Sequence, residues 1–130
     1  MKVFISVDME GVTGVTDPED VLPAGSDYQR GRVFMTGDAN AAVLGAFDAG
    51  ATEVLVNDSH WIMRNLLLEL MDPRARVIKG INKPLCMVQA RKEPAPSWSG
   101  ISQEAGPSFF TVSKDKRYDC VALLRVQRRP

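Results

Sequence analysis

The sequence predicts an α/β fold of the three-layer type, in which a mainly parallel sheet is flanked by helices. Two observations lead to this prediction. Segments with strand and helix patterns alternate along the first ninety residues, and this order is typical of parallel sheets because each parallel connection needs a crossover. In addition, two of the predicted strands end directly in polar side chains, and ligands bind beyond the carboxyl ends of parallel strands.

The first strand and the long helix have clear patterns. Residues 2–7 are apolar and β-branched, which predicts a strand that ends at Asp8. Glycines and prolines after Asp8 indicate a loop. A helix is predicted over residues 27–49, with Asp27 as its N-cap and Gly50 as its C-terminal stop. Apolar residues recur there at steps of three and four, as on one face of a helix: Met35, Ala39, Ala42, Val43, Ala46 and Phe47.

The remaining predicted elements are shorter. A second strand is predicted over residues 53–56, and the polar run Asn57-Asp58-Ser59-His60 follows it. A second helix is predicted over residues 61–71, closed by Asp72-Pro73 because proline does not continue a helix. Residues 76–79 are predicted to form a third strand, and a fourth is predicted near residues 118–126.

Net charge and apolar patterning exclude several classes of partner. Lys plus Arg and Asp plus Glu both number 16, so no global positive field exists to attract nucleic acid or an anionic membrane. No apolar stretch approaches the roughly 18 residues of a membrane span, and the N-terminus lacks a signal-peptide pattern. The two isolated cysteines do not indicate a disulfide framework. We therefore expect a cytoplasmic protein with no nucleic-acid or membrane partner.

Three side chains after the predicted strands are candidate metal ligands. Asp8 and Glu10 are two positions apart, so in extended chain their carboxylates point to the same side. A divalent cation relieves the repulsion between two such carboxylates. His60 follows the second strand, and imidazole is a common zinc ligand. Two acids and one histidine are three donors, the number of protein ligands in many catalytic zinc sites.

Each of these features also has a simpler interpretation. Asp8 and Glu10 could form a solvated acidic loop, and His60 could be a surface residue or a helix cap. Asp58 or Ser59 could cap the helix predicted to follow. A domain that binds an anion at its strand ends would also fit the pattern.

Four motifs add a resemblance to a known family. In order along the chain they are Ser6-Val7-Asp8-Met9-Glu10-Gly11-Val12-Thr13-Gly14-Val15, Tyr28-Gln29-Arg30-Gly31-Arg32 followed by Met35-Thr36, Asp38-Ala39-Asn40-Ala41-Ala42, and Gly50-Ala51-Thr52-Glu53-Val54-Leu55-Val56-Asn57-Asp58-Ser59-His60. With them, residues 1–90 resemble the N-terminal portion of the DppA-type D-aminopeptidase family of zinc metallopeptidases.

The resemblance implies an activity and a metal site. It implies a zinc-dependent aminopeptidase that hydrolyses N-terminal D-amino acids from short D-amino-acid-containing peptides and assembles as a homo-oligomer. It also implies two zinc ions (Zn2+), with Asp8 bridging both ions, Glu10 binding one and His60 binding the other.

The last forty residues depart from the family pattern. Residues 1–90 hold 8 Lys/Arg and 12 Asp/Glu, whereas residues 91–130 hold 8 Lys/Arg, 4 Asp/Glu and four of the eight prolines. We expect an α/β metal-site region over residues 1–90, and a diverged, partly irregular tail over residues 91–130 with one strand. A reading-frame change or truncation after about residue 89 would explain this switch.

The family's further zinc ligands and its catalytic histidine lie downstream, but no histidine follows His60 in this sequence. We therefore expect an α/β domain that is incomplete relative to the family, with no catalytic residue assigned beyond the metal ligands. Fewer than two zinc ions could bind. The alternative function is that of a truncated, catalytically inactive relative that retains a partial metal site.

Overall fold

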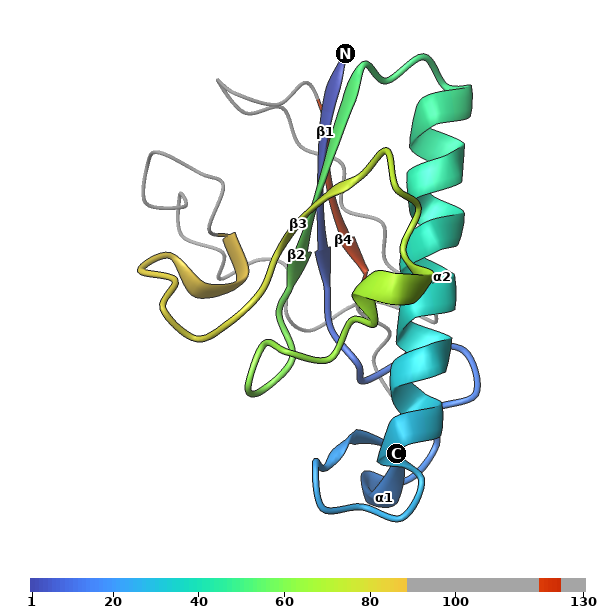
Figure 1. Cartoon of the computed structure of the whole chain (residues 1–130), viewed down its shortest axis with the longest axis vertical. Helices are drawn as coiled ribbons and strands as arrows, with labels where there is room; N and C mark the ends of the chain where they lie inside the picture. Colours follow the sequence, from blue (N-terminus) through green and yellow to red (C-terminus); the bar gives the residue numbers. More distant parts are fainter. Residues whose placement is uncertain (89–119, 125–130) are drawn as a thin grey trace, which may run out of the picture.

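The computed structural model describes residues 1–88 and 120–124 (Figure 1). Four strands and four helical elements occur in these residues, with the short 3-10 helices labelled η. In chain order they are β1 (Lys2–Val7), α1 (Pro18–Val21), α2 (Tyr28–Asp48), β2 (Glu53–Asp58), η1 (Leu68–Leu70), β3 (Arg76–Ile78), η2 (Cys86–Val88) and β4 (Cys120–Leu124).

The four strands form one parallel sheet in the order β3-β2-β1-β4. In the register of this sheet Val7, the last residue of β1, pairs with Asp58 of β2 and Leu124 of β4. The carboxyl ends of the strands therefore meet at one edge, and the loops that follow β1 and β2 leave the sheet side by side (Figure 1). The predicted α/β class with a parallel sheet is confirmed.

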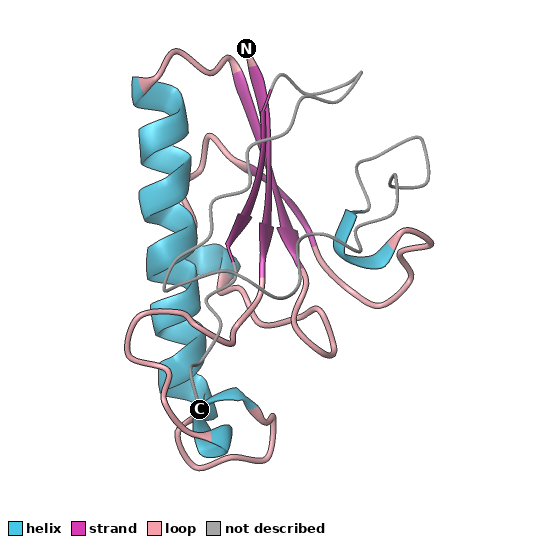
Figure 2. Ribbon diagram, turned by 180° about the vertical axis from the view of Figure 1, so that it is seen from behind, coloured by secondary structure: helices cyan, strands magenta, loops and turns pink. Residues whose placement is uncertain are grey.

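Helix α2 covers one face of the sheet (Figures 1 and 2). Its side chains Met35, Ala39 and Val43 are fully buried in the main core cluster, together with Ile5 of β1 and Val56 of β2. The helical face predicted from the apolar periodicity is thus the face that packs on the sheet. It places the N-terminal half of α2 beside the carboxyl edge of the strands.

The opposite face of the sheet carries a smaller cluster, in which Phe4 and Leu55 are buried and Ile78 packs against them. Element η2 lies on this side (Figure 2). The carbonyl of Met87 accepts hydrogen bonds from the side chains of Ser6 and Asn57, at 2.7 and 3.0 Å. Helical elements therefore flank both faces of the sheet in the described part of the chain.

The two ends of α2 differ in how they are capped. At the C-terminal end Gly50 adopts a φ of +88°. The amide of Gly50 donates to the carbonyl of Phe47, and that of Ala51 donates to the carbonyl of Ala46. This is a Schellman motif, which needs the left-handed residue that glycine supplies. At the other end Asp27 occupies the N-cap position but makes no side-chain capping bond, and it pairs with Arg30 at 3.4 Å instead.

The helix predicted over residues 61–71 is wrong, because this segment is a loop with the single short turn η1. Trp61 and Met63 have φ values of +41° and +53°, which an α-helix does not tolerate. Side chains of other elements bind the loop backbone. The hydroxyl of Thr36 accepts from the Leu67 amide at 3.0 Å, and Arg32 donates to the carbonyl of Asn65 at 2.8 Å. These tertiary bonds override the local helical preference.

A short helix, α1, lies in a segment predicted to be loop. Asp17 caps this helix and forms a capping box with Asp20, and Pro18 lies in the first turn. The Asp20 carboxylate is buried and accepts hydrogen bonds from the amides of Thr16 and Asp17 at 2.8 and 2.9 Å. These bonds lower the pKa of Asp20. The run Asp17-Pro18-Glu19-Asp20 is a start signal that the sequence did contain.

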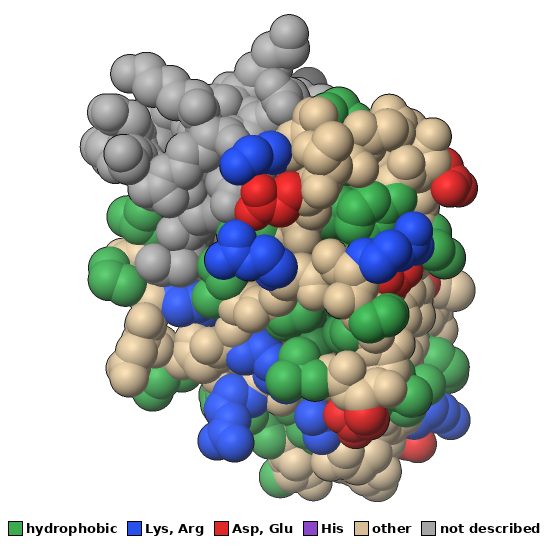
Figure 3. Space-filling view, turned by 45° about the horizontal axis from the view of Figure 1, so that its top comes forward, with side chains coloured by type: hydrophobic (Ala, Val, Ile, Leu, Met, Phe, Trp, Pro, Cys, Tyr) green, Lys and Arg blue, Asp and Glu red, His purple; other side chains and the backbone are tan. Residues whose placement is uncertain are grey.

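Strand β2 runs two residues further than predicted, to Asp58, and β4 falls inside the range predicted for the fourth strand. The rest of the predicted irregular tail, residues 91–119 and 125–130, lies outside the described residues. Among the residues described, no helix has the length and hydropathy needed to cross a bilayer. On the face shown in Figure 3, Lys and Arg side chains are interspersed with hydrophobic and acidic ones.

Candidate metal centre

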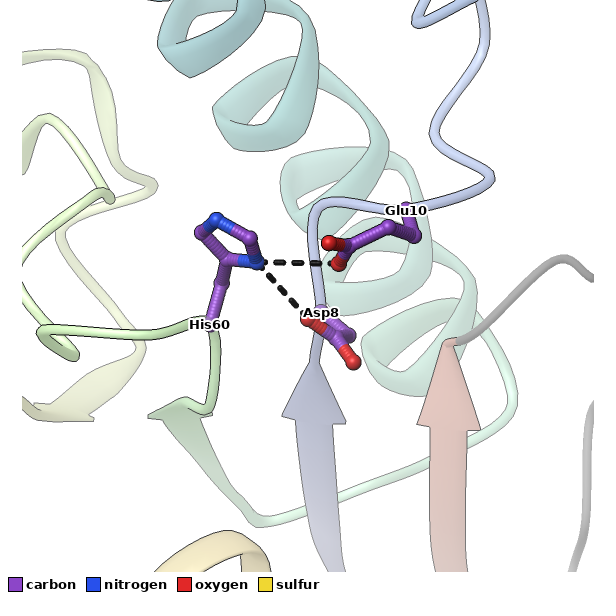
Figure 4. Close-up of side chains that lie close together, drawn as sticks. All are labelled: Asp8, Glu10 and His60. Atoms are coloured by element: carbon purple, nitrogen blue, oxygen red, sulfur yellow. Dashed lines mark hydrogen bonds and ion pairs between the residues drawn. The ribbon is translucent and has the colours of Figure 1, made fainter. Parts of the chain in front are cut away.

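Asp8, Glu10 and His60 meet at the carboxyl edge of the sheet (Figure 4). Asp8 directly follows β1, and Glu10 lies in the turn after it. His60 comes two residues after β2, where the Ser59 amide still donates to the Val7 carbonyl at 2.8 Å. Because β1 and β2 are parallel neighbours, side chains fifty residues apart in the sequence are brought to one point.

The three side chains are in direct contact. The Nδ1 atom of His60 lies 3.1 Å from Oδ1 of Asp8 and 2.9 Å from Oε2 of Glu10. One potential ligand atom from each residue lies within 4.8 Å of the other two. The convergence predicted from the two strand ends is therefore present.

The centre is buried on one side and open on the other. The side chain of His60 is 4% exposed and that of Asp8 is 13% exposed, whereas Glu10 is 47% exposed. An ion or a small molecule can therefore reach the cluster from the side of Glu10, while His60 and Asp8 form its floor.

The second ring nitrogen of His60 is also bound. Nε2 donates to the backbone carbonyl of Val21, the last residue of α1, at 3.0 Å. A histidine that donates through one nitrogen to a fixed acceptor presents the other nitrogen to a metal with its ring orientation fixed. Val21 thus orients His60, but a backbone carbonyl leaves no signal in the sequence.

Without a metal, this geometry favours a protonated His60. Both ring nitrogens face groups that only accept hydrogen bonds, so both carry a proton. Burial lowers the pKa of His60, but the hydrogen bonds to Asp8 and Val21 and the charges of Glu10 and Asp8 outweigh it and raise the pKa from 6.5 to about 9. Burial has the opposite effect on Asp8 and raises its pKa. The hydrogen bonds from His60 and the Met9 amide outweigh burial, so the pKa of Asp8 lies below its ordinary value of 3.8.

These shifts predict how the stability of the metal-free protein depends on pH. Because the pKa of His60 is higher in the folded state, its contribution to the free energy of unfolding is fully present below about pH 6.5 and is lost as the pH rises through about 9. Denaturation in chelator across this range measures the loss, and NMR of the single imidazole measures the pKa. The variant His60→Gln should lack the loss, and an imidazole titrating near 6.5 would contradict the geometry.

The donor set fits a divalent cation. Two ionised carboxylates balance the charge of the ion, and a neutral imidazole with its proton on Nε2 offers the Nδ1 lone pair. Two ligand atoms of one zinc ion lie at most roughly 4.4 Å apart, because each is about 2.0–2.2 Å from the ion. The Nδ1 atom of His60 is within this distance of both carboxylates, at 3.1 and 2.9 Å. An ion held here would take the place of the proton on Nδ1.

Asp58, the other acid near a strand end, is not part of this cluster. Its carboxylate is completely buried and accepts hydrogen bonds from Asn65 and Leu66 in the following loop. At the end of β2, the Asp58 side chain is therefore buried in the protein interior, whereas the His60 side chain contacts Asp8 and Glu10.

Comparisons with known proteins find D-aminopeptidases. A D-aminopeptidase of Bacillus subtilis (strain 168) is 48% identical over 89 residues, which are 68% of this chain and 32% of that protein. The solved structure of the Zn-dependent D-aminopeptidase DppA from Bacillus subtilis, described as a self-compartmentalizing protease, matches with a TM-score of 0.69 and 47% identity. That match covers 70% of this chain and 33% of the other.

The chain thus spans about a third of the length of these relatives. The family model described as D-aminopeptidase matches residues 1–95, which include Asp8, Glu10 and His60. Because this match covers most of the sequence, the chain belongs to the D-aminopeptidase family.

Proposed function

We propose that Asp8, Glu10 and His60 bind zinc in the active site of a D-aminopeptidase, which hydrolyses N-terminal D-amino acids from short peptides. The observation that carries this proposal is the contact of one imidazole nitrogen with two carboxylates, at 2.9 and 3.1 Å, in a member of the D-aminopeptidase family. The Zn-dependence of the structural relative supports zinc as the ion.

In this proposal the site holds two zinc ions. By resemblance to the family, Asp8 would be a ligand of both ions, Glu10 of one and His60 of the other. Bound zinc supplies Lewis-acid chemistry for the hydrolysis of a peptide bond. The chain's own residues hold the ions at a rigid edge of the sheet, and the exposed side at Glu10 admits the peptide.

A second candidate function is that of a catalytically inactive relative with a partial metal site. Within residues 1–88 the cluster contains three donors, which is enough for one zinc ion but not for two complete coordination shells. In both cases we propose a homo-oligomer, since the structural relative is a self-compartmentalizing protease. A cytoplasmic location stays a prediction.

Zinc content and peptidase activity separate these two functions. We expect the purified chain to bind zinc and to release the chromophore from a D-alanyl anilide but not from its L-alanyl counterpart. A chelator should abolish this release, and added zinc should restore it. Zinc binding without release would support the inactive relative, and the absence of zinc binding would contradict both.

A further inference from the structure

We propose that Asn65 is a positioning residue for His60, held in place by the buried carboxylate of Asp58. This inference concerns the loop of residues 60–66, which begins at the candidate ligand and returns to the body of the protein at Leu66. It deepens the proposed function, on which it rests for the role of His60 as a ligand.

The side chain of Asn65, near the end of the loop, is completely buried. Its Nδ2 atom donates to Oδ1 of Asp58 at 2.8 Å and to the backbone carbonyl of His60 at 2.7 Å. Its Oδ1 atom accepts from the hydroxyl of Tyr28 at 2.6 Å. A buried amide with both of its donors and its acceptor engaged has one stable orientation, because any rotation leaves buried polar groups without partners.

Asp58 fixes the far end of the loop. Its Oδ2 atom accepts from the amides of Asn65 and Leu66, at 2.5 and 2.8 Å. Both amides thus have a buried acceptor in the same carboxyl group. The loop therefore closes back on the residue that ends β2, only two positions before His60.

The outside of the loop is held by α2 and by the segment after β3. Arg32 donates to the carbonyl of Asn65 at 2.8 Å, and the amino group of Lys79 donates to the carbonyl of Leu66. The backbone of this loop is thus bonded to side chains from several other elements. Such a loop has little freedom to move as long as these side chains are present.

The loop acts on His60 through the backbone. The His60 carbonyl accepts two hydrogen bonds of 2.7 Å, one from the amide of Met63 and one from Nδ2 of Asn65. These bonds hold the main chain of His60, and the Val21 carbonyl holds the far side of its ring. Fixed at both ends, the ring keeps Nδ1 directed at Asp8 and Glu10, as a metal ligand requires.

The test uses Asn65→Ala, which removes both bonds that Nδ2 donates. In the metal-free wild-type protein the single imidazole should give one sharp set of ¹⁵N and ¹H signals, with slow exchange of the Nε2 proton. In Asn65→Ala these signals should broaden and the proton should exchange rapidly. Zinc affinity should fall by about 10-fold to 100-fold, which is the usual effect of removing a group that hydrogen-bonds to a metal ligand.

A matched control separates positioning from stability. Val43 is completely buried in the core on α2, and it is not part of the cluster of Asp8, Glu10 and His60. We expect Val43→Ala to lower the melting temperature while leaving the imidazole signals and the zinc affinity unchanged. If Asn65→Ala does not fold, Asp58→Asn is measured instead. This variant keeps one oxygen as the acceptor for the loop amides, but its NH₂ group faces that of Asn65, so the hydrogen bond between the two side chains is lost.

The outcomes distinguish this inference from the proposed function. Unchanged imidazole signals and unchanged zinc affinity in the folded variant would overturn the inference. If the imidazole loses its fixed state in the variant but the wild-type protein binds no zinc, the positioning is supported and the metal function is overturned.

Discussion

Zinc affinity should fall by more than about 100-fold when Asp8 is replaced by asparagine. This loss exceeds the roughly 10-fold to 100-fold effect of removing a residue that only hydrogen-bonds to a metal ligand. Asp8 is the mostly buried carboxylate between β1 and His60, so its substitution removes one of two negative charges and one ligand oxygen. Asparagine has the same size as aspartate. It keeps an oxygen that can accept the hydrogen bond from the Met9 amide, which is 2.9 Å long with Asp8. The fold should therefore survive, and isothermal titration with zinc measures the loss.

Asp72→Asn is the control for this substitution. Asp72 pairs with Arg74 at 2.6 Å, and hydrogen bonds from the side chain and the amide of Arg74 lower its pKa to about 2. It takes no part in the cluster of Asp8, Glu10 and His60. The chemical change is the same, so zinc affinity should stay at the wild-type value. Equal losses in the two variants would show that general charge, and not the cluster, attracts the ion.

A second large effect is expected on folding, from Gly31→Ala in α2. A Cβ atom at this position would lie 2.2 Å from the backbone oxygen of Asp20, far inside van der Waals contact. Because that oxygen belongs to α1 and not to a flexible side chain, the two helices must separate. The free energy of unfolding should fall by about 1–3 kcal/mol, as in other overpacked sites. Since α1 carries the Val21 carbonyl that orients His60, zinc affinity should fall as well.

Gly37→Ala provides the comparison, because Gly37 lies in the same helix and nothing lies within 4 Å of its added Cβ. Alanine in a helix interior gains up to about 1 kcal/mol over glycine. This variant should therefore be slightly more stable than wild type, with unchanged zinc affinity. Chemical denaturation of both variants measures the difference, and similar stabilities would show that α1 does not pack closely on α2.

Local patterns in the sequence determined the class of the fold, the packed face of α2 and the choice of candidate metal ligands. The alternation of strand and helix segments predicted a parallel sheet, and apolar steps of three and four predicted the face of α2 that packs on it. Gly50 marked the end of α2 because a Schellman motif needs a residue with positive φ. Asp8, Glu10 and His60 could be selected because ligands gather at the carboxyl ends of parallel strands, and the register of β1 and β2 is what places them there.

Only the tertiary structure decided how residues 60–71 fold and how His60 is oriented. Their sequence is apolar enough for a helix, but Asp58, Thr36 and Arg32 bind its backbone groups from other elements. The acceptor for Nε2 of His60 is the backbone of Val21, and every residue type has a carbonyl. Hydrogen bonds between distant segments depend on where the fold puts each group, so a local pattern could predict the ligands but not the contacts that hold them.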